Sequence, residues 1–264
     1  MSGLRNRMIT RCSLVVRLVD VWTRKTPGAQ EVSVSLEGYV KRPIRKEDGS
    51  YLFLDVETDS AFLEVRSTHY LPVRQELLLS VLNPISPIVT IPLLPSGFYP
   101  QPSGSTGLRS RVLDASGSPA ADALITAYAT DEAAARGRLS QELAEPGDTW
   151  LKAGSWQGAS TAGETFLLRG REAEELVQLA ELAPGGMIRL EKPISNAYRR
   201  GALLLPAVST RSGSEGTVIL PFRGTLPSKF GVAIRAALGQ AAGTADWTAI
   251  AGEVAAMPDI TISN

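Results

Sequence analysis

The chain has 264 residues, of which 27 are basic and 27 acidic, so its formal net charge is zero. At about 100 to 200 residues per domain this length predicts two domains, and a hydrophobic content of 44% supplies a core, which excludes disorder over the whole chain. A single histidine, His69, and a single cysteine, Cys12, exclude most zinc, haem, thiol-protease and Ser-His-Asp sites, because these draw on several such residues.

Neither the single cysteine nor the single histidine is expected to be catalytic. Cys12 opens an apolar run, which favours a small buried side chain over a reactive thiol. His69 stands at the end of an expected strand, where a structural or surface imidazole is favoured over a general base. No phosphate-binding or dinucleotide glycine motif follows an expected strand. The number of Asp and Glu residues does not exclude glycoside hydrolysis by two carboxylates, but the sequence singles out no pair of acidic residues for that role. We therefore predict no catalytic residue, no metal site and no cofactor.

Charge is placed unevenly along the chain. The N-terminal arm, residues 1–11, is basic through three arginines: Arg5, Arg7 and Arg11. Residues 1–100 as a whole carry 12 basic and 10 acidic side chains, so nucleic acid, which selects basic domains, is not an expected partner. The arm is either an ordinary solvated terminus or a docking segment for an acidic protein surface. Residues 131–148 are acidic, so a contact between the arm and this stretch in stacked copies is a candidate interface.

The sequence predicts neither a membrane span nor a secretory leader. The most apolar stretch, residues 77–94, is broken by three prolines, whereas a spanning helix needs about 20 nearly continuous apolar residues. The apolar run behind the arm stops at Arg17 and is too short for the core of a secretory signal. These features predict a product made in the cytoplasm.

Residues 12–95 have the pattern of a β-sandwich. Apolar and polar side chains alternate along several short segments, and turn signals such as Asp48-Gly49 separate them. The pattern predicts about seven antiparallel strands, typical of a sandwich. In the segment 51–54 we expect the leucines to face inward. The predicted core is Val16, Leu18, Val34, Leu36, Leu52, Leu54 and Val65.

A proline-rich stretch follows this first domain. Six prolines occur between residues 84 and 104, and proline stiffens a connection by fixing φ. We take residues 96–106 as a semi-rigid spacer and the domain boundary.

The chain then repeats its opening order, which suggests an internal duplication. Residues 108–128 again give a strand, an aspartate, a turn with proline and a second strand, and residues 161–168 echo residues 47–54. The second copy carries about 20 extra residues between its early strands. This insertion, about 131–160, is rich in alanine and helix formers at its start, so we expect a short helix or an extended tongue, followed by Trp150 and Trp156.

The remaining residues complete or extend the second domain, 107–264. Residues 171–182 have acids in the first turn and Pro-Gly-Gly after the last, as a capped helix does, although part of the segment also alternates. Residues 232–238 and 245–256 fit either a helix or a strand. Strands are predicted at residues 187–190, 202–205, 216–222 and 259–263.

The order of these motifs resembles a known class. A hydrophobic strand, Asp20, a turn with proline, a second strand, an acidic-Gly-aromatic segment and a strand ending in His69-Tyr70 are similar to the carboxypeptidase regulatory-like, or transthyretin-like, β-sandwich domain. Residues 14–94 match well and residues 108–168 more loosely. The resemblance implies a mainly β chain of two tandem transthyretin-like, Ig-like β-sandwiches, the second with a partly helical insertion and a C-terminal extension, and it implies binding, positioning or structural roles.

Two functions compete on this basis. The first is a structural or adaptor subunit of a multi-copy bacterial assembly, with a phage tail or contractile tail-like particle as the preferred setting. Its partners would be other protein subunits, including copies of itself, bound through Arg5, Arg7 and Arg11. The alternative is a carbohydrate- or peptide-binding module that uses Trp150, Trp156 and Tyr128 for stacking, although these tryptophans could instead close the end of a sandwich.

Overall fold

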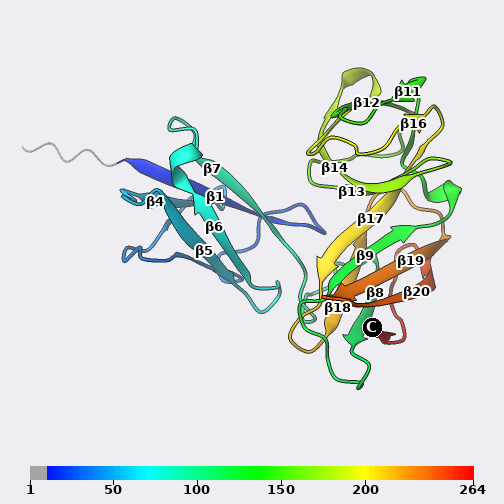
Figure 1. Ribbon diagram of the computed structural model, residues 1–264. Coiled ribbons are helices and arrows are strands. Elements are labelled where there is room, and N and C mark those ends of the chain that lie inside the picture. The colour runs from blue at the N-terminus through cyan, green and yellow to red at the C-terminus, as the bar shows by residue number, and fades with distance from the viewer. Residues whose placement is uncertain (1–10) are drawn as a thin grey trace, which may run out of the picture. The chain divides into compact units, whose positions relative to one another are not determined.

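The computed structural model describes residues 11–264, and it is built almost entirely of strands (Figure 1). The mainly β fold class is confirmed. The chain divides into two compact units, the first ending at Phe98 and the second spanning Tyr99–Asn264. The division falls within the proline-rich stretch 96–106. Helical structure in the described residues is limited to three short 3₁₀ turns: η1 (Leu79–Val81), η2 (Glu132–Ala134) and η3 (Pro184–Gly186).

The first unit contains seven strands in two sheets. The four-stranded sheet has the order β3-β4-β1-β7 and the three-stranded sheet the order β2-β5-β6. The strands are β1 (Cys12–Asp20), β2 (Ser33–Leu36), β3 (Ile44–Arg45), β4 (Tyr51–Leu54), β5 (Ser60–Arg66), β6 (Val73–Leu78) and β7 (Ile88–Leu93). The expectation of a wholly antiparallel sandwich was wrong in one place, because β1 and β7 pair in parallel.

The core of the first unit follows the predicted alternation except in β4. The predicted core residues Val16, Leu18, Val34, Leu36 and Val65 are buried. In β4, however, Tyr51 and Phe53 are buried, whereas Leu52 and Leu54 are only partly so, and the predicted inward leucines were wrong. The larger rings remove more apolar surface from water than leucines would. Phe53 also makes an edge-to-face contact with Tyr39, with ring centroids 5.3 Å apart.

The second unit contains a sandwich of its own. One sheet has β18 (Thr217–Phe222), β8 (Thr106–Leu113) and β21 (Val254–Ala256) in that order, and β22 (Ile260–Thr261) also pairs with β8. The facing sheet contains β17 (Leu203–Arg211), β9 (Leu124–Ala129), β19 (Lys229–Leu238) and β20 (Ala241–Ile250) as neighbours. Leucine, isoleucine, valine, alanine and phenylalanine side chains from both sheets form the core between them.

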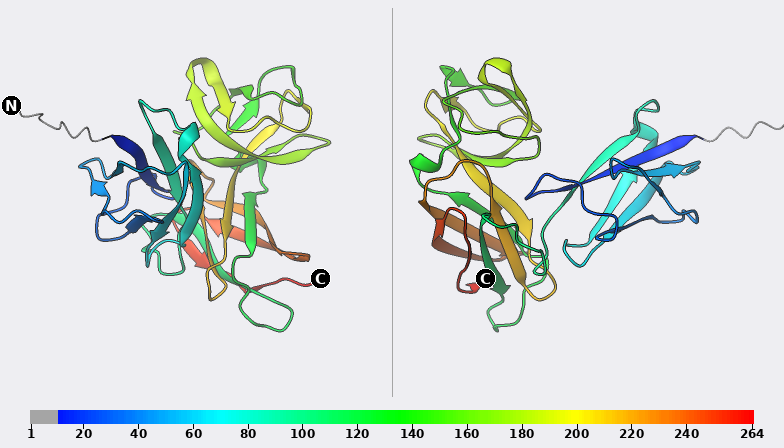
Figure 2. Two further views of the ribbon diagram at one scale, coloured as in Figure 1. Left: turned by 60° about the vertical axis from the view of Figure 1, so that its left-hand side comes forward. Right: turned by 180° about the vertical axis from the view of Figure 1, so that it is seen from behind.

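A closed barrel is inserted between β9 and β17. Each of its six strands pairs with two others, in the circular order β10-β12-β15-β14-β13-β17 and back to β10. The long strand β17 belongs to both the barrel and the sandwich. Its first part, Leu203–Ala207, pairs with β13 of the barrel, and its second part, Ala207–Arg211, pairs with β9 of the sandwich. Figure 2 shows the barrel at one end of the second unit's sandwich. The other barrel strands are β10 (Gly137–Leu139), β12 (Trp150–Gly154), β13 (Thr165–Arg169), β14 (Glu174–Ala183) and β15 (Met187–Leu190).

Two segments that were predicted to be helical form strands of the barrel instead. Residues 171–182 contain the strand β14 rather than a helix, with Val177 and Leu179 buried in the barrel core. The expected helix in the insertion 131–160 reduces to the single 3₁₀ turn η2, followed by β10, β12 and the short strand β11 (Leu143–Ala144), which pairs with β16 (Tyr198–Arg199). Pairing with two neighbouring strands outweighs helix propensity, which contributes less than about 1 kcal/mol per residue.

The other segments of the second unit form strands. The predicted strands at 187–190, 202–205, 216–222 and 259–263 correspond to β15, β17, β18 and β22. The two ambiguous segments lie in β19 and in β20 with β21. In the described part of the chain, no helix is long and apolar enough to cross a membrane.

Candidate interaction surface

Two of the three arginines predicted to bind a partner, Arg5 and Arg7, lie outside the described residues. Arg11 immediately precedes β1 and is exposed. Its backbone exchanges two hydrogen bonds with Asp55: the Arg11 N–H donates to Oδ1 over 2.8 Å, and the Asp55 N–H donates to the Arg11 carbonyl over 2.9 Å. Arg11, the last residue of the arm, is therefore held next to the end of β4.

The predicted aromatic residues are not gathered into one stacking surface. Trp150 is 43% exposed at the start of β12. Trp156 is partly buried against the barrel core, with its ring centroid 5.6 Å from that of Phe166. Tyr128 is buried, and the guanidinium groups of Arg169 and Arg235 lie 5.7 Å and 5.4 Å from its ring centroid. Only Trp150 of the three offers a broad surface to a ligand.

The scarce reactive residues have ordinary surroundings. His69 is partly buried next to the isolated bridge at Tyr70, and its backbone N–H donates to Ser67 Oγ over 3.0 Å. Cys12 is a free, partly buried thiol at the start of β1. Among residues 11–264, no group of three or more His, Cys, Asp or Glu side chains could hold a metal ion.

Arg136 organises the loop between β12 and β13, a role that no sequence motif predicts. Its side chain is buried, and its guanidinium donates hydrogen bonds to the carbonyls of Gln157 (2.7 Å), Ala159 (2.7 Å) and Arg223 (3.2 Å), and to Ser160 Oγ (3.1 Å). Burial lowers the pKa of Arg136, opposed by the charge of Glu164. Backbone carbonyls thus stabilise a charge that has no ion-pair partner within residues 11–264, and these hydrogen bonds fix the loop.

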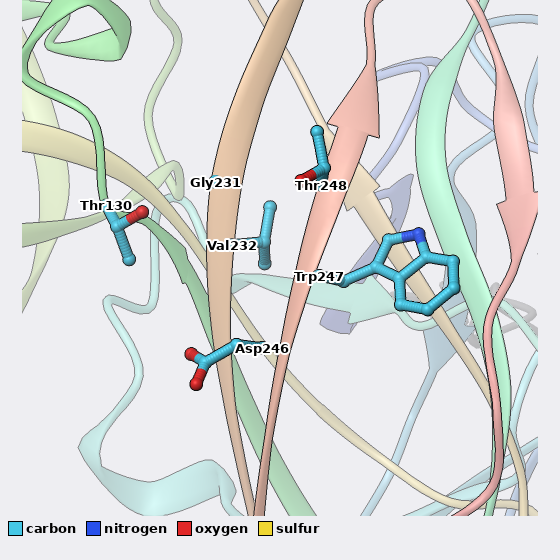
Figure 3. A pocket seen from close by; sticks show the side chains of 6 residues that line it. All are labelled: Thr130, Gly231, Val232, Asp246, Trp247 and Thr248. Atoms are coloured by element: carbon cyan, nitrogen blue, oxygen red, sulfur yellow. The ribbon is translucent and has the colours of Figure 1, made fainter.

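A shallow pocket of about 560 Å³ lies over β19 and β20 (Figure 3). Its lining residues are Thr130, Gly231, Val232, Asp246, Trp247 and Thr248. Gly231 makes room for its neighbours, because a Cβ there would overlap the Thr130 hydroxyl and lie 3.5 Å from Asp131 Oδ1. The Gly231 N–H donates to Asp131 Oδ2 over 2.8 Å. Asp131 and Asp246 therefore place two carboxylates on this face of the sheet.

Neither carboxylate has a cationic partner among the described residues, since no ion pair there includes Asp131 or Asp246. The nearby arginines are already engaged. Glu174 lies 3.1 Å from Arg235 Nη2 and 3.4 Å from Arg169 Nε. The face of β20 thus presents one carboxylate, Asp246, without an ion-pair partner among the described residues, and Lys229 lies on the same face of the neighbouring strand β19.

The strand β20 is the free edge of the nine-stranded sheet, since the other end of the sheet closes into the barrel. Two contacts fix which backbone groups point outward. Ala242 exchanges hydrogen bonds of 3.0 and 3.1 Å with Ser263, on the side away from β19, and the Ala251 N–H donates to Ser228 beside the pair Lys229–Ile250. Because outward and inward groups alternate, Thr244, Asp246 and Thr248 direct their N–H and C=O groups outward. The structure gives these groups no partner within residues 11–264.

Other sheet edges in the described chain are short, charged or interrupted by proline. The strand β3 has two residues and β2 has four. The strand β6 carries Arg74 and Glu76, while β7 contains Pro92 and β18 contains Pro221. These are the usual protections against pairing with another chain. The strand β20 has ten residues, no proline and one charge, Asp246.

The sandwich core is also open beside β20. Trp247, Ala245 and Ala241, on the inner face of this strand, pack against the core but remain only partly buried. Figure 3 shows the Trp247 indole and the Asp246 carboxylate on opposite sides of β20. An added strand would therefore find hydrogen-bonding groups along the edge, apolar surface on one face and a carboxylate on the other.

No family model and no curated protein matches the sequence. Among solved structures, the chain is similar to BcpA, the major pilin subunit of Bacillus cereus, with 8% identity over 97% of this chain and 70% of that one and a TM-score of 0.26. The shaft pilin SpaA from Lactobacillus rhamnosus GG gives 9% identity over 97% and 99% of the two chains, with a TM-score of 0.25.

A third similar structure is a streptococcal ancillary pilin, with 10% identity over 97% of this chain and 63% of that one and a TM-score of 0.22. The structures that the chain resembles are thus pilin subunits.

Proposed function

We propose that this chain is a non-enzymatic structural or adaptor subunit of a multi-copy bacterial assembly. The observation that carries the proposal is the unprotected edge of β20. Long edges with free backbone groups pair readily with other chains, and proteins that work alone usually cover or interrupt them. Among residues 11–264 the other edges are protected, whereas β20, held at Ala242 by Ser263, leaves the outward groups of Thr244, Asp246 and Thr248 free beside a partly open core.

The construction of the molecule supports the same role. Each unit has its own buried core, and the barrel gives the second unit a rigid, closed end. Buried polar groups such as Arg136 serve to fix loops rather than to face a cleft. This arrangement suits a subunit that positions surfaces for neighbours.

The narrower setting and the family are parts of the proposal. We propose a phage tail or contractile tail-like particle as the assembly, built after synthesis in the cytoplasm, and the carboxypeptidase regulatory-like class as the family of the first unit. The seven strands in two sheets of that unit are compatible with the class. Finding the chain in purified tail particles by mass spectrometry would support this setting, and its absence from them would remove it.

Self-association of the full chain tests the proposed function. Mass photometry and sedimentation velocity over a concentration series from nanomolar to hundreds of micromolar should show oligomers or binding to a co-purified subunit. A chain that stays monomeric over this range, and that captures no subunit from the cells that make it, would contradict the proposal.

A further inference from the structure

The free edge of β20 sets three requirements for the strand that would bind it. Its backbone must be extended and free of proline, because the outward groups of Thr244, Asp246 and Thr248 need partners. Its inner face must be apolar, to continue the core beside Trp247. Its outer face should be basic, to lie beside Asp246.

The N-terminal arm of this chain meets these requirements. Residues 4–11 contain neither proline nor glycine. In an extended segment alternate side chains share a face, so Leu4, Asn6, Met8 and Thr10 would lie on one side and Arg5, Arg7 and Ile9 on the other. The side with Leu4 and Met8 matches Trp247, and the two arginines match the carboxylate of Asp246.

From this match we infer that the edge of β20 binds residues 4–10 of a second copy of this chain as an added strand, since the backbone of Arg11 is held by Asp55 of its own unit. The inference rests on the proposed function, since it names the contact by which copies associate. Copies joined in this head-to-tail manner would form a chain or a ring, as heterologous contacts do.

A symmetric pairing of β20 with β20 of a second copy fits less well. A two-fold axis at Asp246 would place the two Asp246 carboxylates directly opposite each other, and like charges in that position are destabilising. The same carboxylate favours a basic strand, so charge selects the arm over a second β20.

Charge reversal in the full chain tests the contact. We expect the double substitution Arg5→Asp with Arg7→Asp, and separately Asp246→Arg, to weaken self-association about ten-fold. Combining all three should restore much of it. Matched controls reverse exposed charges elsewhere, Arg42→Asp in the first unit and Glu215→Arg in the second, and should change association less than two-fold.

Cysteine cross-linking shows which copies are joined. In a Cys12→Ser background, one full-length chain carries Ile9→Cys and a second, differently tagged chain carries Thr244→Cys or Thr248→Cys. Under mild oxidation, a disulfide between the two tags should form in at least one mixture, and each chain alone should give less cross-linked product.

The outcomes separate this inference from the proposed function. Cross-links between tags, with rescue by the combined charge swap, support it. If the charge reversals do not change the strength of self-association and no cross-link joins the two tags, the inference is overturned while the proposed assembly role stands. A disulfide that forms within single, dilute chains carrying both cysteines would also overturn it, because the arm would then bind its own β20. A chain that neither self-associates nor binds another subunit would overturn both, whereas one that binds another subunit without self-association would overturn the inference alone.

Discussion

The phenolic hydroxyl of Tyr70 donates a 2.9 Å hydrogen bond to the buried carboxylate of Asp20, 50 residues earlier in the chain. The other oxygen of Asp20 accepts the N–H groups of Trp22 (2.7 Å) and Thr23 (3.0 Å), so this carboxylate both shapes the turn after β1 and ties it to the strand end at Tyr70. Two residues of the sequence motif therefore have a structural explanation: they hold one end of the first unit's sandwich together.

Removal of the Tyr70 hydroxyl should destabilise the first unit. Tyr70→Phe takes a hydrogen bond away from a buried carboxylate oxygen, and we expect a loss of about 1–3 kcal/mol in the free energy of unfolding. Tyr51→Phe is the matched control, because the buried Tyr51 hydroxyl has no hydrogen-bond partner. Urea denaturation should find this control neutral or slightly more stable; equal losses in the two variants would contradict the account.

The register of β4 predicts unequal effects of truncation. Phe53 is fully buried, so Phe53→Ala should cost about 3–5 kcal/mol of stability. Leu54, its neighbour on the other face, is only partly buried, and Leu54→Ala should cost less than half as much. Denaturation curves of the two variants test which side chains of β4 face the core. A larger loss of stability for Leu54→Ala than for Phe53→Ala would show that the leucines face inward.

Gly224 should be the less replaceable of two glycines with similar backbone angles. Gly224 has φ of 89° and Gly201 has φ of 91°, so alanine at either position carries about 1–2 kcal/mol of left-handed strain. A Cβ at Gly224 would also overlap the guanidinium of Arg136, whereas nothing lies within 4 Å of one at Gly201. Gly224→Ala should therefore lose a further 1–3 kcal/mol, approximately. Similar stabilities of the two variants would show that the Arg136 side chain can move aside at little cost in free energy.

Asp114 should titrate below the ordinary range of an aspartate. Its Oδ1 accepts the Ser116 hydroxyl (2.6 Å) and the N–H groups of Ser116 (2.8 Å) and Ser118 (2.9 Å), and the bond from the Ser116 hydroxyl is the largest cause of its lowered pKa. Because the folded pKa lies below the unfolded value near 3.8, the stabilisation is present above that pH and is lost as pH falls through the folded pKa.

A carbon-detected NMR titration measures this directly. The Asp114 carboxyl should titrate below 3.8 in the native chain, and Ser116→Ala should move its pKa upward. A titration midpoint that is ordinary in the native chain, and unmoved in the variant, would contradict the turn geometry.

Local patterns predicted the first unit well because its strands alternate and its turns carry Asp, Gly and Pro. The positions of Val16, Val34 and Val65 follow from period-two alternation alone. Alternation could not decide β4, where both faces of Tyr51-Leu52-Phe53-Leu54 are apolar, and only packing against the facing sheet selects the rings.

The barrel could not be predicted, because its closure depends on pairings between distant segments. The segment that forms β14 has good helix formers and acids at its start, and it becomes a strand only because β13 and β15 lie on either side. The role of Arg136 could not be predicted either, because its hydrogen-bond partners are mostly backbone carbonyls, which any residue supplies. The free edge of β20 is visible only once the strand order is known.

Removing one outward N–H of β20 tests whether copies of the chain join through this edge. Thr248→Pro removes that donor without removing a hydrogen bond to β19, whereas Thr248→Val keeps the donor and the strand propensity. Near-UV circular dichroism would establish that both variants keep the native fold, and sedimentation velocity would then measure their self-association. We predict at least about ten-fold weaker association for Thr248→Pro and little change for Thr248→Val, because an added strand needs the N–H. Folded variants that associate as strongly as the native chain would show that copies do not join through the edge of β20.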